Sequence, residues 1–95
     1  MNIYKELEQF IEGEAFDILE TVVDNNELTI GDLEDTSEIT AMISDAIEEM
    51  LADNYDGEAL EIVETIFNQN EEEFFNTHMP FFICTLRSYI KGREY

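Results

Sequence analysis

The chain has 95 residues, of which 24 are acidic and four are basic, and its formal net charge at pH 7 is −20. Because 44% of the residues are hydrophobic, the chain can bury a core and is not an acidic disordered tail. Its charge has the wrong sign for direct binding to nucleic acid or to an anionic membrane, which leaves cations and basic proteins as its natural partners.

The same composition suggests where the protein works. No run of residues approaches the roughly 20 apolar residues that a membrane span needs, and the first residues contain no apolar signal region. A single cysteine cannot form an internal disulfide, which is typical of a reducing compartment. We therefore expect a cytoplasmic protein.

The first predicted element is a helix over residues 2–24. Its apolar residues recur at steps of three and four, as in Leu7, Ile11 and Leu19, and most of its acids gather on the opposite side. Gly13 interrupts the segment and costs about 1 kcal/mol relative to alanine inside a helix. We expect a kink there or a division into two helices.

A short ambiguous stretch follows this segment. Asn25-Asn26 predicts a turn. Residues 28–33 fit both the alternation of a strand and a single helical turn. We expect a connector that places three apolar side chains under the core, namely Leu28, Ile30 and Leu33.

The clearest predicted helix runs over residues 35–53. Its acids cover the outer surface with no basic residue between them. Asp35 or Thr36 can cap the first free amides, and Glu38 has the spacing of a capping box with Asp35. The apolar residues share one face at helical spacing: Ile39, Met42, Ile43, Ala46, Ile47, Met50 and Leu51.

Further helices are predicted after a turn at residues 54–57. Residues 58–68 carry another apolar stripe, Asn70 is a favourable N-cap for the acids at 71–73, and Pro80 suits the first turn of a final helix. The chain is therefore predicted to be all-α, a compact bundle of about four to six helices with a strongly acidic surface. We expect residues 1–95 to form a single acidic helical domain.

The acids follow no metal-binding motif. The nearest approach to a calcium loop places Ala52 and Val63 where an aspartate and a bidentate glutamate are needed. A di-metal carboxylate site needs Glu-x-x-His pairs, and the single histidine, His78, has Phe75 three residues before it. We expect neither a metal site nor a cofactor.

The sequence also contains no recognisable catalytic motif. Cys84 lies among apolar residues in a chain rich in acids, which favours a buried structural cysteine over a reactive thiolate. His78 is expected to cap a helix or to lie on the surface. Ser37 opens a predicted helix but lacks the Asp-Ser-Leu motif of acyl carrier proteins, and no glycine-rich phosphate loop is present. We do not expect an enzyme.

The excess of acids is the strongest functional signal. Solvated helices usually mix signs, because Glu–Lys pairs one turn apart stabilise a helix by about 0.2–0.5 kcal/mol each. Residues 1–86 carry 23 acids and one base, whereas Arg87, Lys91 and Arg93 cluster near the C-terminal end. Retaining so many like charges indicates selection for the negative field itself.

The density of this charge is close to that of DNA. Duplex DNA carries one charge per about 1.7 Å of axis, so about twenty charges correspond to roughly 34 Å of duplex. A compact domain of this length has a diameter of roughly 32 Å. Acids one helical turn apart, such as Asp45 and Glu49, are spaced by roughly 5–6 Å along the axis, as neighbouring phosphates are. The sequence therefore predicts imitation of about ten base pairs.

Residues 32–39 (Asp-Leu-Glu-Asp-Thr-Ser-Glu-Ile) add a resemblance. This acidic-apolar helix start is similar to one in the small acidic DNA-mimic inhibitors made by phages, which are of the anti-restriction and anti-CRISPR type, and in particular to the overcome-classical-restriction group. The resemblance implies an all-helical inhibitor that acts in the host cytoplasm and evades host defence. The chain departs from that group by ending in a basic patch instead of a long acidic tail.

The proposed partner is a basic DNA-binding protein of the host, such as a restriction enzyme, a CRISPR effector or another DNA-binding defence protein. An alternative is an acidic protein-interaction module, such as an antitoxin or a chaperone for a basic protein, that binds away from any DNA site. The predicted partner-binding residues are the carboxylates on the outer helical faces: Glu6, Asp17, Glu20, Asp32, Glu34, Asp35, Glu38, Asp45, Glu48, Glu49, Asp53, Asp56, Glu58, Glu61 and Glu64.

The C-terminal part of the chain also predicts a homodimer contact. It carries more large aromatic residues than a short helical hairpin usually buries, and basic residues lie beside them. We expect this end to meet a second copy, with its bases facing the partner's acids, and packing within one monomer is the alternative. The residues concerned are Phe74, Phe75, Phe81, Phe82, Arg87, Lys91 and Arg93.

Overall fold

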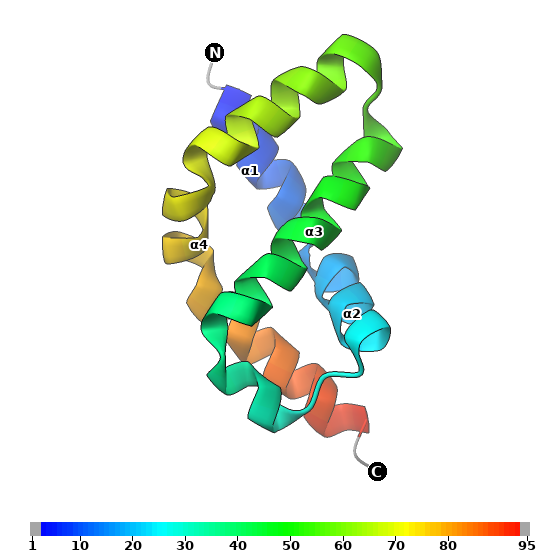
Figure 1. Ribbon diagram of the computed structural model, residues 1–95, viewed down its shortest axis with the longest axis vertical. Helices are drawn as coiled ribbons and strands as arrows, with labels where there is room; N and C mark the ends of the chain where they lie inside the picture. The colour runs from blue at the N-terminus through cyan, green and yellow to red at the C-terminus, as the bar shows by residue number, and fades with distance from the viewer. Residues whose placement is uncertain (1–2, 94–95) are drawn as a thin grey trace.

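The computed structural model describes residues 3–93 and is helical throughout, apart from short connections (Figure 1). Four α-helices and one short 3-10 helix follow one another in the chain: α1 (Ile3–Gly13), α2 (Ala15–Asn26), η1 (Ile30–Glu34), α3 (Thr36–Asn54) and α4 (Gly57–Arg93). The prediction of an all-α fold is confirmed, and the number of α-helices lies within the predicted range.

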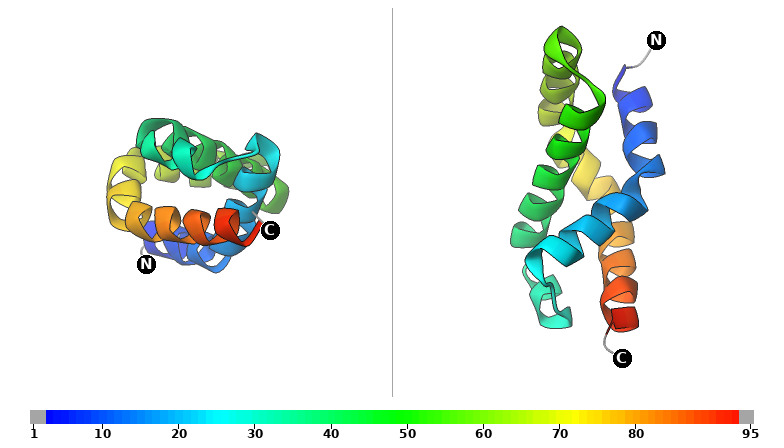
Figure 2. Two further views of the ribbon diagram at one scale, coloured as in Figure 1. Left: turned by 90° about the horizontal axis from the view of Figure 1, so that it is seen from below. Right: turned by 90° about the vertical axis from the view of Figure 1, so that its right-hand side faces the viewer.

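The helices form two layers that α2 and α4 join. Figure 2 shows α3 beside the N-terminal half of α4 in one layer, whereas in the other layer α1 and the C-terminal half of α4 follow one another along the long axis. α2 crosses from the second layer to the first, and it packs against both α3 and α4. The molecule is elongated, with extents of 44 × 24 × 20 Å.

α4 is one bent helix of 37 residues. A straight helix of that length would measure roughly 55 Å, which exceeds the 44 Å long axis of the molecule. Figure 1 shows the bend in the yellow and gold turns, ahead of Pro80. Proline lacks an N–H and its ring crowds the carbonyl four residues earlier, so it favours a bend at this place.

The prediction of separate helices within this stretch is wrong. Asn70 does not cap a new helix, because its side-chain Nδ2 donates to the carbonyl oxygen of Ile66 at 2.8 Å inside α4. Pro80 lies in the helix interior instead of in a first turn. The acids at residues 71–73 therefore lie in the middle of a helix, without free N-terminal amides beside them.

The division near Gly13 is confirmed. α1 ends at Gly13 and α2 begins at Ala15, with the backbone of Glu14 outside the helical range at φ −100° and ψ 5°. The predicted turn at Asn25-Asn26 falls slightly too early. α2 continues to Asn26, and the chain turns at Glu27, whose left-handed φ of 48° ends the helix.

The two elements that follow agree with the sequence. Leu28 and Leu33 are buried and Ile30 is partly buried, so the connector covers the core as expected. α3 begins one residue after its cap, where Asp35 Oδ1 accepts a hydrogen bond from the Glu38 N–H at 3.2 Å. That bond satisfies one of the free amides at the helix start.

Apolar side chains from every helix meet in one core. The face of α3 is completely buried at Ile39, Ile43, Ile47 and Leu51, each with an exposed fraction of 0%. Near the bend of α4, aromatic rings pack edge to face, with the centroids of Phe67 and Phe74 5.7 Å apart. The remaining buried residues are Leu7, Ile11, Ala15, Ile18, Leu19, Val22, Val23, Leu28, Leu33, Val63, Phe75, Phe82, Leu86 and Ile90.

This core accounts for most of the C-terminal aromatic residues. Phe74, Phe75 and Phe82 are buried within the monomer, so their number does not require a second copy. Phe81 is different, because 48% of it is exposed. Within residues 3–93, none of the helices combines the length and apolar character that a membrane span requires.

The core predicts a contrast between two phenylalanines of α4 that lie seven residues apart. Phe74→Ala should lower the free energy of unfolding by about 3–5 kcal/mol, because it removes a fully buried ring. Phe81→Ala should lower it by less than about 1 kcal/mol. Urea unfolding of both variants in dilute solution measures the difference, and equal losses would contradict the packing described above.

Candidate partner-binding surface

All fifteen predicted carboxylates lie at the surface. In the described part of the chain no charged side chain is buried. Thirteen of the fifteen residues are exposed, and the other two, Glu48 and Glu64, are half-buried. The sequence therefore identified accessible acids correctly, and their arrangement decides which of them can act together.

α3 carries the central group of acids. Because the apolar face of α3 is buried, its opposite face is exposed to solvent. Figure 1 shows α3 crossing the front of the molecule. We refer to the five acids of this helix as the α3 ridge: Glu38, Asp45, Glu48, Glu49 and Asp53. The ridge has further acids on both of its flanks.

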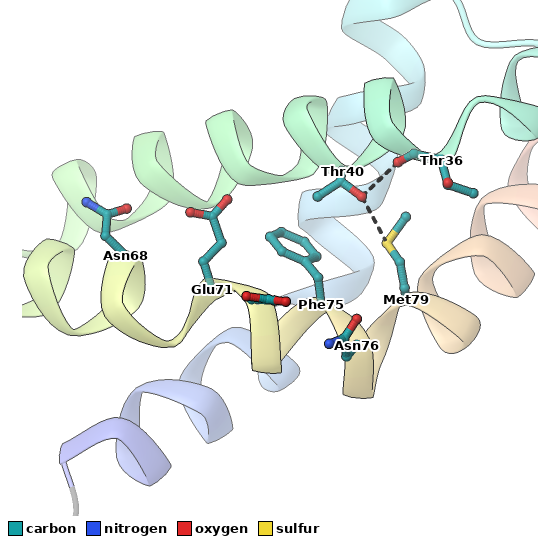
Figure 3. A pocket seen from close by; sticks show the side chains of 8 residues that line it. Thr36, Thr40, Asn68, Glu71, Phe75, Asn76 and Met79 are labelled. Carbon is teal, nitrogen blue, oxygen red and sulfur yellow. Dashed lines mark hydrogen bonds between the residues drawn. The ribbon is translucent and has the colours of Figure 1, made fainter.

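On the α4 flank, carboxylates from two helices gather around Glu48. Burial raises the pKa of the Glu48 carboxyl above its usual value, and the negative charges of Asp45, Glu64 and Glu71 raise it further. Ser44 of α3 donates a hydrogen bond to Glu71 Oε1 at 3.1 Å, and Figure 3 shows Glu71 directed toward α3. Glu71 is not among the predicted residues, because the sequence placed this acid at the start of a separate helix.

On the α2 flank, four acids line one groove of about 210 Å³. Glu14 and Asp17 come from α2 and the turn before it, and Glu49 and Asp53 come from the ridge. Glu14 was also missed, since the sequence indicated only a break at this place. The ridge and its two flanks thus bring together carboxylates from α2, α3 and α4.

A second groove opens between the start of α3 and the middle of α4 (Figure 3), with a volume of about 570 Å³. Its walls combine carboxylates and amides with the apolar side chains of Phe75 and Met79. Thr40 lies at its rim, with Oγ1 3.8 Å from the sulfur of Met79. Carboxylates and amide oxygens are acceptors for the N–H groups of arginine and lysine, so this groove suits a basic side chain with an aliphatic stem.

Not every predicted carboxylate belongs to the ridge. Glu6 lies on α1, in the layer away from α3 (Figure 2). Asp32 is engaged locally, because its Oδ2 accepts from the Thr29 N–H at 2.8 Å, and Asp35 caps α3. Both therefore have a structural role. Five others are exposed on α2, η1, the connection between α3 and α4, and the start of α4: Glu20, Glu34, Asp56, Glu58 and Glu61.

Two predictions about single residues are wrong. Cys84 is exposed instead of buried, because it lies on α4 between the core positions Phe82 and Leu86 and points to neither. His78 neither caps a helix nor lies on the surface, since only 12% of its side chain is exposed. Its Nε2 lies 2.9 Å from a carboxylate oxygen of Glu8 on α1.

Tyr4 lies on the same side of α1 as this contact. Its hydroxyl donates to Glu8 Oε2 across 3.5 Å. Burial raises the pKa of the Tyr4 phenol, and the charges of Glu8 and Glu73 raise it further. The acids near α1 thus form a group separate from the α3 ridge.

No family model matches the sequence, and comparison with curated proteins and with solved structures finds no similar chain. The resemblance to the phage inhibitors therefore stays a prediction. We infer the function from the geometry and the charge of the surface.

The acids around Glu48 predict that neutralising Glu48 stabilises the folded protein, and that this gain depends on pH. The raised pKa means that the folded state binds this proton more tightly than the unfolded state, so the charged carboxylate destabilises the fold above that pKa. Glu48→Gln should stabilise the protein by up to about 0.5 kcal/mol near pH 7, because it removes a screened repulsion between like charges. The gain should disappear as the pH falls below the usual value of 4.5.

Urea unfolding at about pH 7 and about pH 3.5 measures this difference. Glu72→Gln, which changes an exposed acid of α4, is the matched control and should gain less. A gain that persisted at the lower pH would contradict the account.

Proposed function

We propose that the protein is a DNA-mimic inhibitor that occupies the DNA-binding site of a basic host protein, such as a restriction enzyme, a CRISPR effector or another DNA-binding defence protein. The observation that carries this proposal is the α3 ridge with its flanks, where carboxylates of α4 and of α2 lie beside those of α3. No lysine or arginine occurs between residues 6 and 86. A groove lined by lysine and arginine would therefore contact acids of this segment with no positively charged side chain of the segment between them.

The dimensions of the molecule support imitation of a short duplex. Its long axis of 44 Å equals about 13 base pairs of DNA at 3.4 Å per step. A net charge of −20 over that length corresponds to one charge per about 2.2 Å, compared with one per about 1.7 Å in duplex DNA. The molecule is longer than a compact domain of its size, so its linear charge density is about three quarters of that of DNA.

The core supports the proposal by holding the acids in place. Ile39, Ile43 and Ile47 are completely buried beneath the ridge, so α3 cannot rotate without exposing them. A surface that is already ordered loses little conformational entropy on binding. The basic groove would also relieve the repulsion among the clustered carboxylates and release the counterions held by both surfaces.

The groove in Figure 3 favours a second candidate function, an acidic interaction module such as an antitoxin or a chaperone for a basic protein. Its apolar walls at Phe75 and Met79 are typical of a contact with a protein side chain. Such a module would bind away from any DNA site. The two functions differ in whether the protein and DNA exclude each other from the partner.

The proposal predicts a steep dependence of affinity on salt. The partner, captured from a host lysate on the immobilised chain, should lose affinity steeply between about 50 and 200 mM salt. Neutralising three ridge acids together, as Asp45→Asn, Glu49→Gln and Asp53→Asn, should reduce the slope of log K against log salt by up to about three.

The matched control neutralises three exposed acids off the ridge, as Glu6→Gln, Glu27→Gln and Glu73→Gln. This control changes the net charge by the same amount as the ridge variant, but it should retain most of the slope of log K against log salt. Affinity that stays flat with salt, or equal losses in the two triple variants, would contradict a DNA-like contact through the ridge.

We also propose that a second copy of the chain binds at the exposed aromatic pair of Phe16 and Phe81. Phe16 is 57% and Phe81 48% exposed, and their ring centroids lie 6.1 Å apart. A shallow cavity of about 440 Å³ adjoins Phe16 and Tyr89. This replaces the four-phenylalanine contact that the sequence suggested, because three of those rings lie in the core.

Charge complementarity favours a second copy of the chain as the partner that binds at the Phe16–Phe81 pair. Arg87 and Lys91 are exposed on α4, six and ten residues after Phe81, whereas α2 carries exposed acids such as Asp17, which follows Phe16 in the sequence. A twofold pairing would place the bases of one α4 against the acids of the partner's α2. A basic host protein would meet the like charges of Arg87 and Lys91 here, which disfavours it.

Light scattering at micromolar concentration tests this contact. The wild type should have the mass of a dimer, and Phe81→Ser should have the mass of a monomer. Ile62→Ser is the matched control, because Ile62 is also 48% exposed on α4 but lies in its other half. A monomeric wild type, or a dimer that survives in Phe81→Ser, would overturn the proposal.

A further inference from the structure

Three metal-ligating side chains meet where α1 packs against α4. His78 Nε2 lies 2.9 Å from Glu8 Oε2 and 3.5 Å from Glu12 Oε1. The three atoms lie within 4.8 Å of one another. Glu8 and Glu12 are one turn apart on α1, so both side chains reach the same side of that helix.

The surroundings hold His78 in this position. Its ring packs on the rings of Phe74, at a centroid distance of 4.6 Å, and Phe82, at 5.9 Å. Phe74 and Phe82 are themselves buried in the core. A ligand whose orientation is fixed by packing loses little freedom when it binds a metal.

The acid side of the group is more open. The side chain of Glu12 is 50% exposed, and a cavity of about 230 Å³ adjoins Glu12 and His78. An ion can therefore enter from solvent, and a water molecule has room beside it. The net charge of −20 raises the concentration of cations near the surface.

We propose that Glu8, Glu12 and His78 bind a divalent transition metal, of which Zn²⁺ is the best match, and that this ion links α1 to α4. Zn²⁺ binds imidazole nitrogen and carboxylate oxygen at about 2.0–2.2 Å, which places tetrahedral ligand atoms about 3.4 Å apart. The distance of 3.5 Å matches that spacing, and the distance of 2.9 Å would lengthen by about 0.5 Å when the ion binds. Three protein ligands leave the fourth position to water.

The imidazole distinguishes this site from the rest of the acidic surface. Ca²⁺ and Mg²⁺ prefer oxygen ligands, and carboxylates elsewhere on the surface hold them only by charge. Two carboxylates and a neutral imidazole also balance the charge of a divalent ion. The sequence did not indicate this site, because His78 and Glu8 are 70 residues apart in the chain. The inference is independent of the proposed inhibitory function.

Zn²⁺ titration of the full chain, in excess Mg²⁺ and with Cys84→Ser to remove the exposed thiol, tests the site. The chain has one histidine, so its imidazole nitrogen resonances report on His78 alone. They should shift and saturate at one equivalent of Zn²⁺. Calorimetry should show that His78→Gln and Glu12→Gln each weaken binding by at least about tenfold.

Glu27→Gln is the charge-matched control, because it removes an exposed acid at the end of α2 and should leave the affinity unchanged. Circular dichroism verifies that each variant is folded. If His78 only forms an ion pair with the two carboxylates, Zn²⁺ will not move its resonances. That result, or Zn²⁺ binding by Glu12→Gln as tight as that of wild type, would overturn the proposal.

Discussion

The burial of the apolar face of α3 determines both how the helices pack and where the acids lie. A chain with a net charge of −20 repels itself, and apolar contacts such as those of Ile39, Ile43 and Ile47 offset that repulsion. The same contacts determine which side chains face outward. Stability and the position of the acids therefore have one origin, because α3 cannot bury its apolar residues without presenting Asp45 and Glu49 to solvent.

The bend of α4 extends this arrangement to the second layer. Phe67 and Phe74 pack against each other near the bend and lie in the core that both layers share. The first half of α4 brings Glu64 and Glu71 to the ridge, whereas the second half places His78 against α1. One helix thus positions both the acids of the proposed DNA-like surface and the histidine of the proposed metal site.

The sequence predicted the helix boundaries in the first half of the chain, because residues at those boundaries determine where each helix begins and ends. The break after Gly13 and the cap at Asp35 follow from the residues at those positions. In α4 the local signals failed, since Asn70 and Pro80 indicate helix starts but packing of the neighbouring aromatic rings keeps the helix continuous. The exposure of the acids was predictable from periodicity. Their grouping around Glu48 was not, because it depends on contacts between α3 and α4 that are distant in sequence.

Competition between the protein and DNA for the same partner shows whether the protein occupies a DNA-binding site. A labelled duplex of about 13 base pairs, the length that the long axis matches, is bound to the captured host protein, and the unlabelled chain is added while fluorescence anisotropy is recorded. The account predicts complete displacement of the duplex, with an apparent affinity that weakens as salt rises. A ternary complex, in which the partner holds DNA and the protein together, would contradict it.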